Sequence, residues 1–214
     1  MIKIAYCDVS NLNLHEAYEL LPPNRKRKFN SFRFDKDKKL SAGAYLLLDK
    51  LLKEKNVTDP IFKVQEYGKA YISNFEDVYF NLSHSGRIVS CAISDREVGI
   101  DVEYNDPEID LDIAKNYFYN SEYKSIMNSK TPSDEFFNYW VLKESYMKYT
   151  GLGFQLDLDS FEIIIDDEIR LKDDENNLKF SLFDVDNYKL AVCSKYNVNQ
   201  YFEYSPEELV NQKR

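Results

Sequence analysis

The stretch FNLSHSGRIVSCAIS, residues 80–94, predicts a β-hairpin that closes around Ser85-Gly86. A similar strand sequence, KLAVCS at 189–194, occurs much later in the chain. In both regions a helix with core-facing apolar spacing precedes the strands, at 39–53 and at 133–149. Helix followed by sheet thus occurs twice. This order predicts an α+β fold of two pseudo-symmetric lobes, each a small, mostly antiparallel sheet with a packed helix, and an active site in the cleft between them.

The expected boundary between the lobes lies after residue 104, which gives an N-terminal lobe of residues 1–104 and a C-terminal lobe of residues 105–214. Apolar spacing and turn residues place the remaining elements. Strands are expected at 1–9, 61–65, 79–83, 87–93, 98–103, 161–165, 179–183 and 189–193, and helices near 14–21, from 22 through the basic run, at 39–53, 111–117, 121–127 and 133–149.

The composition indicates a folded protein. The chain has 214 residues, of which 43% are hydrophobic and 15% aromatic, and this is enough for a buried core. Cys7, Cys91 and Cys193 are widely spaced in apolar, strand-like runs, so buried thiols are expected rather than metal ligands or nucleophiles. The first residues lack a basic segment followed by an apolar one, and no apolar run approaches the ~18 residues that cross a bilayer. A cytoplasmic location away from membranes is expected.

The net charge of −9 is unevenly distributed. The segment from Arg25 to Lys39 has eight Lys or Arg and only two Asp, so the rest of the chain is strongly acidic. Such a basic run is often a solvated helix face. The functional alternative is a local docking site for phosphate or for an acidic protein surface. The acidic remainder argues against a long nucleic-acid track, because affinity for nucleic acid depends on neutralising many phosphates.

Two acidic residues alternate in the strand-like stretch VGIDVE at 98–103. Side chains two apart lie on one face of a strand, so Asp101 and Glu103 converge. A hard divalent cation relieves the repulsion between such carboxylates, and Mg²⁺ takes one or two of them together with water and phosphate oxygens. The alternative is an exposed strand with two solvated acids.

A second cluster lies in the helical segment 136–148. Phe136, Trp140, Glu144 and Lys148 follow one stripe of this helix, since side chains four apart share a face. An acid and a base in line with the single tryptophan point to a functional site, because burying charge is unfavourable unless it is paired or bound to metal. A simple Glu144–Lys148 ion pair at the edge of a packed face is the alternative.

The turn of the first hairpin is the third cluster. Backbone amides, hydroxyl groups and the His84 ring in FNLSHSG could hold a phosphate, although a plain hairpin turn would have the same sequence. The other histidine, His15, lies in an amphipathic segment where a surface position is expected.

Four segments taken in order, QEYGKAYI (65–72), FNLSHSG (80–86), VGIDVE (98–103) and WVLKESYMK (140–148), resemble the motif set of the Sfp-type 4′-phosphopantetheinyl transferases. The resemblance extends from about Leu21 to Asp159. It implies a monomer of two pseudo-symmetric α+β halves with coenzyme A between them. The implied reaction is the Mg²⁺-dependent transfer of 4′-phosphopantetheine from coenzyme A to a serine of an apo acyl or peptidyl carrier protein, as in nonribosomal peptide and antibiotic biosynthesis, with release of 3′,5′-adenosine bisphosphate.

The resemblance also assigns roles by motif. Asp101, Glu103 and Glu144 resemble metal ligands for Mg²⁺, with Mn²⁺ as an alternative, and Glu144 also resembles a general base. Lys148 resembles a lysine that contacts the pyrophosphate, and Trp140 would support the site by packing. The residues that the resemblance assigns to coenzyme A binding are Arg25, Lys28, Lys39, Ser41, Lys69, Ser83, His84, Lys143 and Lys148.

Two positions depart from the family pattern. Ala70 replaces the proline that commonly follows the motif lysine, and Leu40 replaces an arginine that often precedes the small hydroxyl residue. Lys39 could supply the missing charge at a different angle from the helix.

Two other functions fit parts of the pattern. A Mg²⁺-dependent nuclease or phosphodiesterase also uses two carboxylates and a lysine, and a non-catalytic protein that binds coenzyme A or a carrier would keep the basic residues without needing all three carboxylates.

Overall fold

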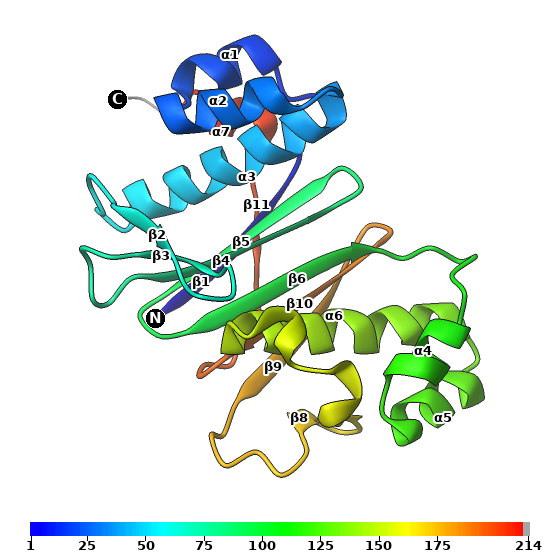
Figure 1. Cartoon of the computed structure of the whole chain (residues 1–214). Helices are drawn as coiled ribbons and strands as arrows, with labels where there is room; N and C mark the ends of the chain where they lie inside the picture. The colour runs from blue at the N-terminus through cyan, green and yellow to red at the C-terminus, as the bar shows by residue number, and fades with distance from the viewer. Residues whose placement is uncertain (212–214) are drawn as a thin grey trace.

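The computed structural model describes residues 1–211, and they form two halves with the same order of elements (Figure 1). The first half comprises β1 (Ile2–Asp8), α1 (Leu14–Leu20), α2 (Pro23–Ser31), α3 (Asp35–Glu54), β2 (Phe62–Val64), β3 (Ala70–Ile72), β4 (Tyr79–Ser85) and β5 (Ile88–Ser94). The second comprises β6 (Val98–Tyr104), α4 (Asp112–Tyr117), α5 (Asn120–Asn128), α6 (Pro132–Thr150), β7 (Ile163–Ile165), β8 (Ile169–Leu171), β9 (Lys179–Val185) and β10 (Tyr188–Ser194). Short 3₁₀ turns η1 (Gly153–Gln155) and η2 (Leu158–Ser160) follow α6, and β11 (Phe202–Glu203) and α7 (Pro206–Val210) are the last elements of the described residues.

The two halves also share a sheet topology. One sheet has the strand order β11-β1-β5-β4 and the other β6-β10-β9. Each contains a long hairpin, β4–β5 or β9–β10, whose second strand also pairs with the first strand of its half: β5 pairs with β1, and β10 pairs with β6. A long helix, α3 or α6, and a small hairpin, β2–β3 or β7–β8, precede the long hairpin in each half. The predicted α+β fold with two related lobes is confirmed.

The lobes divide at a different place from the expected boundary at residue 104. Strand β6 was assigned to the N-terminal lobe, but it pairs antiparallel with β10 in the second sheet, with Ile100 opposite Val192. The chain also returns at its end, because β11 pairs parallel with β1 and Leu209 of α7 is buried in the core of the first lobe. The N-terminal lobe therefore ends before Val98 and includes the segment 202–211, while residues 212–214 lie outside the described part of the chain.

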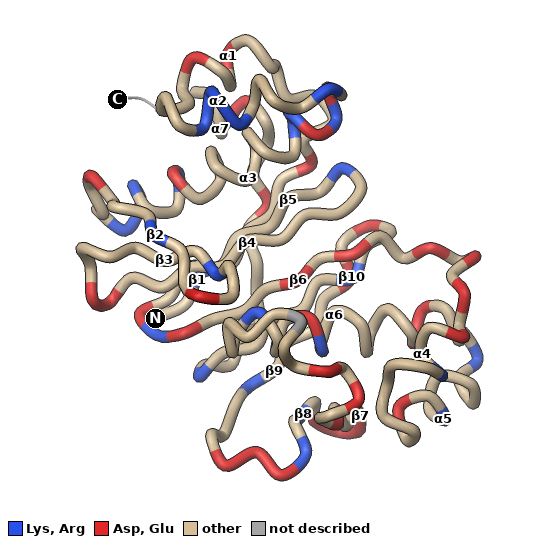
Figure 2. The backbone as a smooth tube through the Cα atoms, viewed as in Figure 1, with Lys and Arg blue, Asp and Glu red and all other residues tan. Residues whose placement is uncertain are grey.

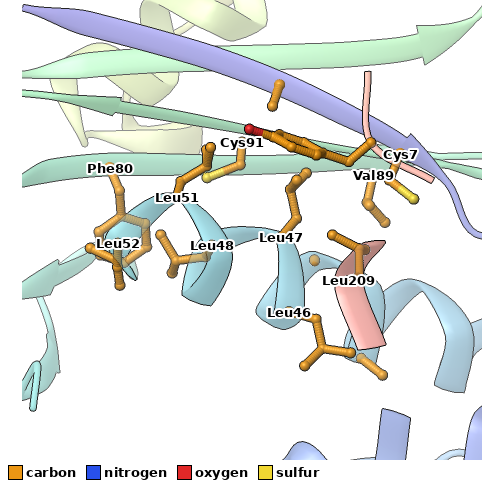
Figure 3. Packing of buried hydrophobic residues seen from close by; sticks show 14 of the residues in the cluster. Cys7, Leu46, Leu47, Leu48, Leu51, Leu52, Phe80, Val89, Cys91 and Leu209 are labelled. Carbon is orange, nitrogen blue, oxygen red and sulfur yellow. The ribbon is translucent and has the colours of Figure 1, made fainter. Parts of the chain in front are cut away.

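Helix α3 forms the core of the first lobe. Its apolar residues recur at helical spacing and are buried against the strands, as Figure 3 shows for Leu47, Leu48, Leu51 and the strand residue Cys91. All three cysteines are buried free thiols, as expected from the sequence.

Helix α6 forms the core of the second lobe and packs on β6 and β10. Pro132 lies in its first turn, where the missing amide proton is tolerated, and Gly151 ends it in the left-handed conformation (φ 74°). Trp140 packs against Phe118 and Phe136. Helix α6 thereby brings its C-terminal turns next to β6.

The charges are separated along the molecule. Figure 2 shows Lys and Arg gathered along α2 and the start of α3, while Asp and Glu are frequent in the segments between β6 and α4 and between β8 and β9. None of the helices within residues 1–211 is both long and apolar enough to cross a membrane.

Candidate functional site

The two sheets meet at their edge strands β4 and β6, and side chains join them in place of a hydrogen-bonded ladder. Alternate residues of β4 point toward β6 because strand side chains alternate between faces. Asn81 Oδ1 accepts the Ile100 amide (3.0 Å), and Ser85 Oγ accepts the Tyr104 amide (3.2 Å). Between them Ser83 Oγ donates to Asp101 Oδ1 (2.8 Å). We call this row of bonds the seam.

Gly99 allows β6 to approach α6 closely. A Cβ atom at this position would lie 1.9 Å from the Ser145 carbonyl oxygen and 2.4 Å from the Tyr149 amide nitrogen, so any other residue would push the strand and the helix apart. This close approach brings Asp101 of β6 within reach of Lys148 of α6.

The cluster at the centre of the seam consists of Asp101, Ser83 and Lys148. Lys148 Nζ donates to Asp101 Oδ1 (2.6 Å) and to Ser83 Oγ (2.8 Å). Asp101 is only 2% exposed, and its Oδ2 atom is buried without a hydrogen-bond partner. A buried carboxylate oxygen without a partner is unfavourable, so the arrangement is incomplete in the protein alone. Burial of Asp101 excludes the alternative of two solvated acids.

Glu103 and Glu144 face the same cluster. Burial and then the negative charge of Asp101 raise the pKa of Glu103 to about 7, and the same two causes raise the pKa of Glu144. Lys148 pairs with Asp101, whereas the alternative of a simple surface pair required it to pair with Glu144. Three acidic groups that each disfavour the charge of the others are therefore gathered around one ammonium group.

These residues fit a divalent cation in their chemistry. Hard cations bind carboxylate oxygens, and Asp101 Oδ2 is a buried oxygen that lacks a partner. Within residues 1–211, however, no group of three His, Cys, Asp or Glu side chains is already arranged as a metal site. The carboxylates would have to come together around the ion.

A basic pocket of about 280 Å³ lies on one side of the seam. Four of the residues that the sequence assigned to coenzyme A line it: Arg25, Lys28, Ser41 and His84. Arg25 Nη2 donates to the Ser41 carbonyl oxygen (2.9 Å) and to its hydroxyl (3.3 Å), which links α2 to α3. Burial and then the nearby charge of Lys148 lower the pKa of His84, so the neutral ring is favoured at neutral pH.

A second pocket, of about 370 Å³, lies between the β2–β3 hairpin and the end of α6. Its lining is mainly apolar and includes Tyr67, Phe80 and Met147, with Glu144 and Lys148 also present. Leu82 lines both pockets, so they are neighbours along one continuous surface. The cluster of Asp101, Ser83 and Lys148 lies beside them.

Lys143 lies outside this arrangement, which corrects its assignment to coenzyme A binding. Its side chain is fully buried in an ion pair with Glu122 (2.7 Å) and also donates to the Phe161 carbonyl oxygen (2.8 Å). Adjacent residues of a helix point about 100° apart, so Lys143 faces the lobe interior while Glu144 faces the seam. An ammonium group without free surface cannot contact a ligand.

Two further lysines are engaged elsewhere. Lys69 Nζ donates to Glu97 (2.6 Å) and to the carbonyl oxygens of Tyr149 (3.0 Å) and Val98 (3.2 Å), so its stem lines the apolar pocket while its charge joins the hairpin to α6. Lys39 Nζ donates to the Ser10 carbonyl oxygen and lines a separate pocket. Neither ammonium group lies with the basic pocket.

The sequence interpretation missed Asn81, Ser85 and Gly99. A signal for the first two was present, because polar residues alternate in FNLSHSG as a strand with one polar face requires. Glycine at 99, inside a strand pattern, is typical of close backbone approach.

Comparison with known proteins identifies the family. A family model described as the 4'-phosphopantetheinyl transferase superfamily matches residues 97–193. The 4'-phosphopantetheinyl transferase gsp of Aneurinibacillus migulanus is 34% identical over 174 residues, which cover 76% of this chain and 71% of that protein. A 4'-phosphopantetheinyl transferase of Bacillus subtilis is 42% identical over 143 residues (63% of each chain), and Sfp of Bacillus subtilis (strain 168) is 38% identical over 146 residues (65% of each).

The match to the two Bacillus subtilis relatives thus spans less than two thirds of their length. Among solved structures, Thermotoga maritima holo-[acyl-carrier-protein] synthase matches with a TM-score of 0.40 and 22% identity, over 45% of this chain and 61% of that chain, a likeness too weak to inform function. The match to gsp covers more than two thirds of that protein. The residues matched by the family model include β6 and α6, which contain Asp101 and Lys148. The chain belongs to the 4'-phosphopantetheinyl transferase superfamily.

Proposed function

We propose that the chain transfers the 4′-phosphopantetheine group of coenzyme A to a serine hydroxyl of an apo acyl or peptidyl carrier protein and releases 3′,5′-adenosine bisphosphate. The observation that supports this proposal most strongly is the incomplete cluster of Asp101, Ser83 and Lys148. This cluster combines a buried carboxylate oxygen that lacks a partner with the ammonium group of Lys148, and it lies beside a basic pocket and an apolar pocket. Family membership points to the same reaction.

The two pockets suggest how coenzyme A binds. The basic pocket suits the 3′-phosphate, because Arg25 and Lys28 supply positive charge and the Ser41 and His84 side chains supply hydrogen bonds. The apolar pocket suits the adenine base, which can pack against Phe80 and Tyr67. The pyrophosphate would then reach Lys148, which lines the apolar pocket and also belongs to the cluster.

We further propose that Asp101, Glu103 and Glu144 hold Mg²⁺, with Mn²⁺ as an alternative. The bound ion would orient the pyrophosphate and neutralise part of its charge. The raised pKa values of Glu103 and Glu144 support this role, because carboxylates that repel each other are stabilised by a shared cation.

The chain's own residues account for the remaining chemistry. The serine oxygen of the carrier attacks the phosphorus bonded to pantetheine, and the bond from that phosphorus to the bridging oxygen of the leaving nucleotide breaks. Glu144 accepts the serine proton, a role that typically contributes 10²–10⁴-fold to the rate. Burial favours the protonated form of Glu144, which makes it a stronger base than a solvated carboxylate. Lys148 stabilises the negative charge that develops on the leaving phosphate.

Intact-mass spectrometry of the carrier tests this function. The protein is incubated with coenzyme A, Mg²⁺ and an apo carrier, with a chelator in one control and a carrier whose acceptor serine is replaced by alanine in another. We expect a Mg²⁺-dependent gain of about 340 Da, the mass of one phosphopantetheine in this transfer, and no gain in either control. No gain with several carriers, while calorimetry shows coenzyme A binding, would contradict the proposed transfer.

We also propose that the enzyme acts as a cytoplasmic monomer, serves a nonribosomal peptide or related pathway, and binds neither nucleic acid nor membrane. The acidic net charge of −9 supports the absence of nucleic-acid binding, and three free thiols suit a reducing compartment. Light scattering after size-exclusion chromatography tests the oligomeric state, and the mass of a dimer would contradict the proposed monomer.

A further inference from the structure

Strand β6 contains two of the proposed metal ligands, yet it belongs to the sheet of the second lobe while Ser83 belongs to the first. Its position relative to β4 therefore depends on the seam. The bond from the Ile100 amide to Asn81 Oδ1 (3.0 Å) lies immediately before Asp101 in the chain. Of the two seam bonds made by backbone amides of β6, it is the one next to Asp101 in the sequence.

The Ile100 amide depends on this bond. Ile100 is completely buried, and its amide relies on the half-buried Asn81 side chain as its acceptor. The corresponding bond at the other end of the strand, from the Tyr104 amide to Ser85, is exposed, and water can replace it. Asn81 thus holds the buried end of the strand.

The same bond fixes which way the Asn81 amide group points. A backbone amide donates only to an acceptor, so the oxygen faces Ile100 and the nitrogen faces elsewhere. No residue within 1–211 provides a hydrogen-bond partner for Asn81 Nδ2, and Asn81 lines the apolar pocket. The Nδ2 amino group, which carries two N–H donors, is therefore available to a ligand in that pocket.

We propose that Asn81 is a positioning residue: its bond to the Ile100 amide fixes the position of β6 relative to β4, and so places Asp101 next to Ser83 and Lys148. Its Nδ2 group also donates a hydrogen bond to an acceptor atom of the molecule bound in the apolar pocket. The positioning part is independent of the reaction. The donor part rests on the proposed function, in which a ring nitrogen of the purine base is the acceptor.

Two substitutions separate the parts. Asn81→Leu removes both the acceptor and the donor, whereas Asn81→Asp keeps an acceptor for Ile100, loses the donor and adds negative charge. Asn128→Leu, at an exposed position of α5, is the matched control. For each protein, amide exchange at Ile100 is followed by NMR, and kcat and KM for coenzyme A are measured with an apo carrier.

In Asn81→Leu we expect Ile100 exchange to accelerate at least about tenfold, because its protecting bond is lost, and kcat to fall about 10- to 100-fold, as for a displaced catalytic group. In Asn81→Asp, exchange and kcat should return to within about threefold of the parent, while KM rises about tenfold from the lost donor and the added charge. The control should match the parent in all three quantities.

Two results would overturn the proposal. Unchanged Ile100 exchange in Asn81→Leu would show that Asn81 does not hold β6. Faster exchange with an unchanged kcat would show that the bond does not position Asp101. If the parent has no transferase activity, the exchange measurement still tests the hold on β6, so failure of this inference and failure of the proposed function remain distinguishable.

Discussion

Lys143 and Lys148 lie on the same helix, and each pairs with a carboxylate from another element, but their surroundings differ. Lys143 and Glu122 have side chains that are 0% and 1% exposed. Lys148 is 28% exposed beside Asp101, which is 2% exposed. Helix α6 thus presents one ion pair to the interior of its lobe and another to the seam.

The two carboxylates also differ in how completely they are bonded. Glu122 accepts from Lys143 and from the backbone amides of Tyr119 (3.0 Å) and Ile163 (2.7 Å), so both of its oxygens have partners. Asp101 Oδ1 has two partners and Oδ2 has none. The fully bonded Lys143–Glu122 pair holds α5, α6 and β7 together. The Lys148–Asp101 pair leaves one carboxylate oxygen of Asp101 available to a ligand.

The largest effect is expected from Lys143→Met, which breaks the interior pair. Glu122 would remain buried without its cation, so the free energy of unfolding should fall by about 3–5 kcal/mol. Urea denaturation at pH 7 measures this change. Lys172→Met, which removes the exposed partner of Glu162, is the control and should change stability by less than about 1 kcal/mol.

The pH dependence of the same variant provides a check. Burial already raises the pKa of Glu122, and loss of Lys143 removes the charge that opposes this shift. A group whose pKa is raised on folding is stabilising below its unfolded pKa, and this contribution is lost as pH rises through the folded pKa. Lys143→Met should therefore be less destabilised at pH 5 than at pH 7. Equal loss at both pH values would contradict the account of the interior pair.

The next effect is expected from Asp101→Asn, which alters the pair at the seam. Asparagine keeps an oxygen for Ser83 but loses the negative charge, so we expect kcat for transfer to fall at least about 100-fold. The free energy of unfolding should change by less than about 1 kcal/mol, because Lys148 is partly exposed and can turn to solvent. Near-normal turnover, or a loss of stability like that of Lys143→Met, would remove the distinction between the two pairs.

The sequence predicted the charged residues beside the seam because each of them lies within a local pattern. Alternation placed Asp101 and Glu103 on one side of a strand, and helical spacing aligned Glu144 with Lys148. The structure supports this grouping through the pair that joins Asp101 to Lys148. The long helices and hairpins were predictable for the same reason, since their spacing extends over many residues.

The interior pair could not be predicted in this way. Lys143 stands beside Glu144 in the motif, and its partner Glu122 lies 21 residues earlier on another helix, so no local spacing relates them. Long-range pairing also explains the misplaced boundary, because β6 follows β5 in the chain but pairs with β10. The short strands β3, β8 and β11 have too few residues to show alternation.

The smaller of the two effects on kcat is expected from Gly99→Ala, which should disturb the Asp101–Lys148 pair and leave the Glu122–Lys143 pair intact. The added Cβ would meet the α6 backbone at Ser145 and Tyr149, and such overpacking typically costs about 1–3 kcal/mol of stability. Because β6 must move away from α6, Asp101 should lose contact with Lys148 and kcat should fall about tenfold. The interior pair lies away from β6, so NMR should show faster amide exchange at Ile100 but unchanged exchange at Ile163, whose amide bonds to Glu122. Faster exchange at both sites would mean that α6 transmits the disturbance and that the two ion pairs form one unit.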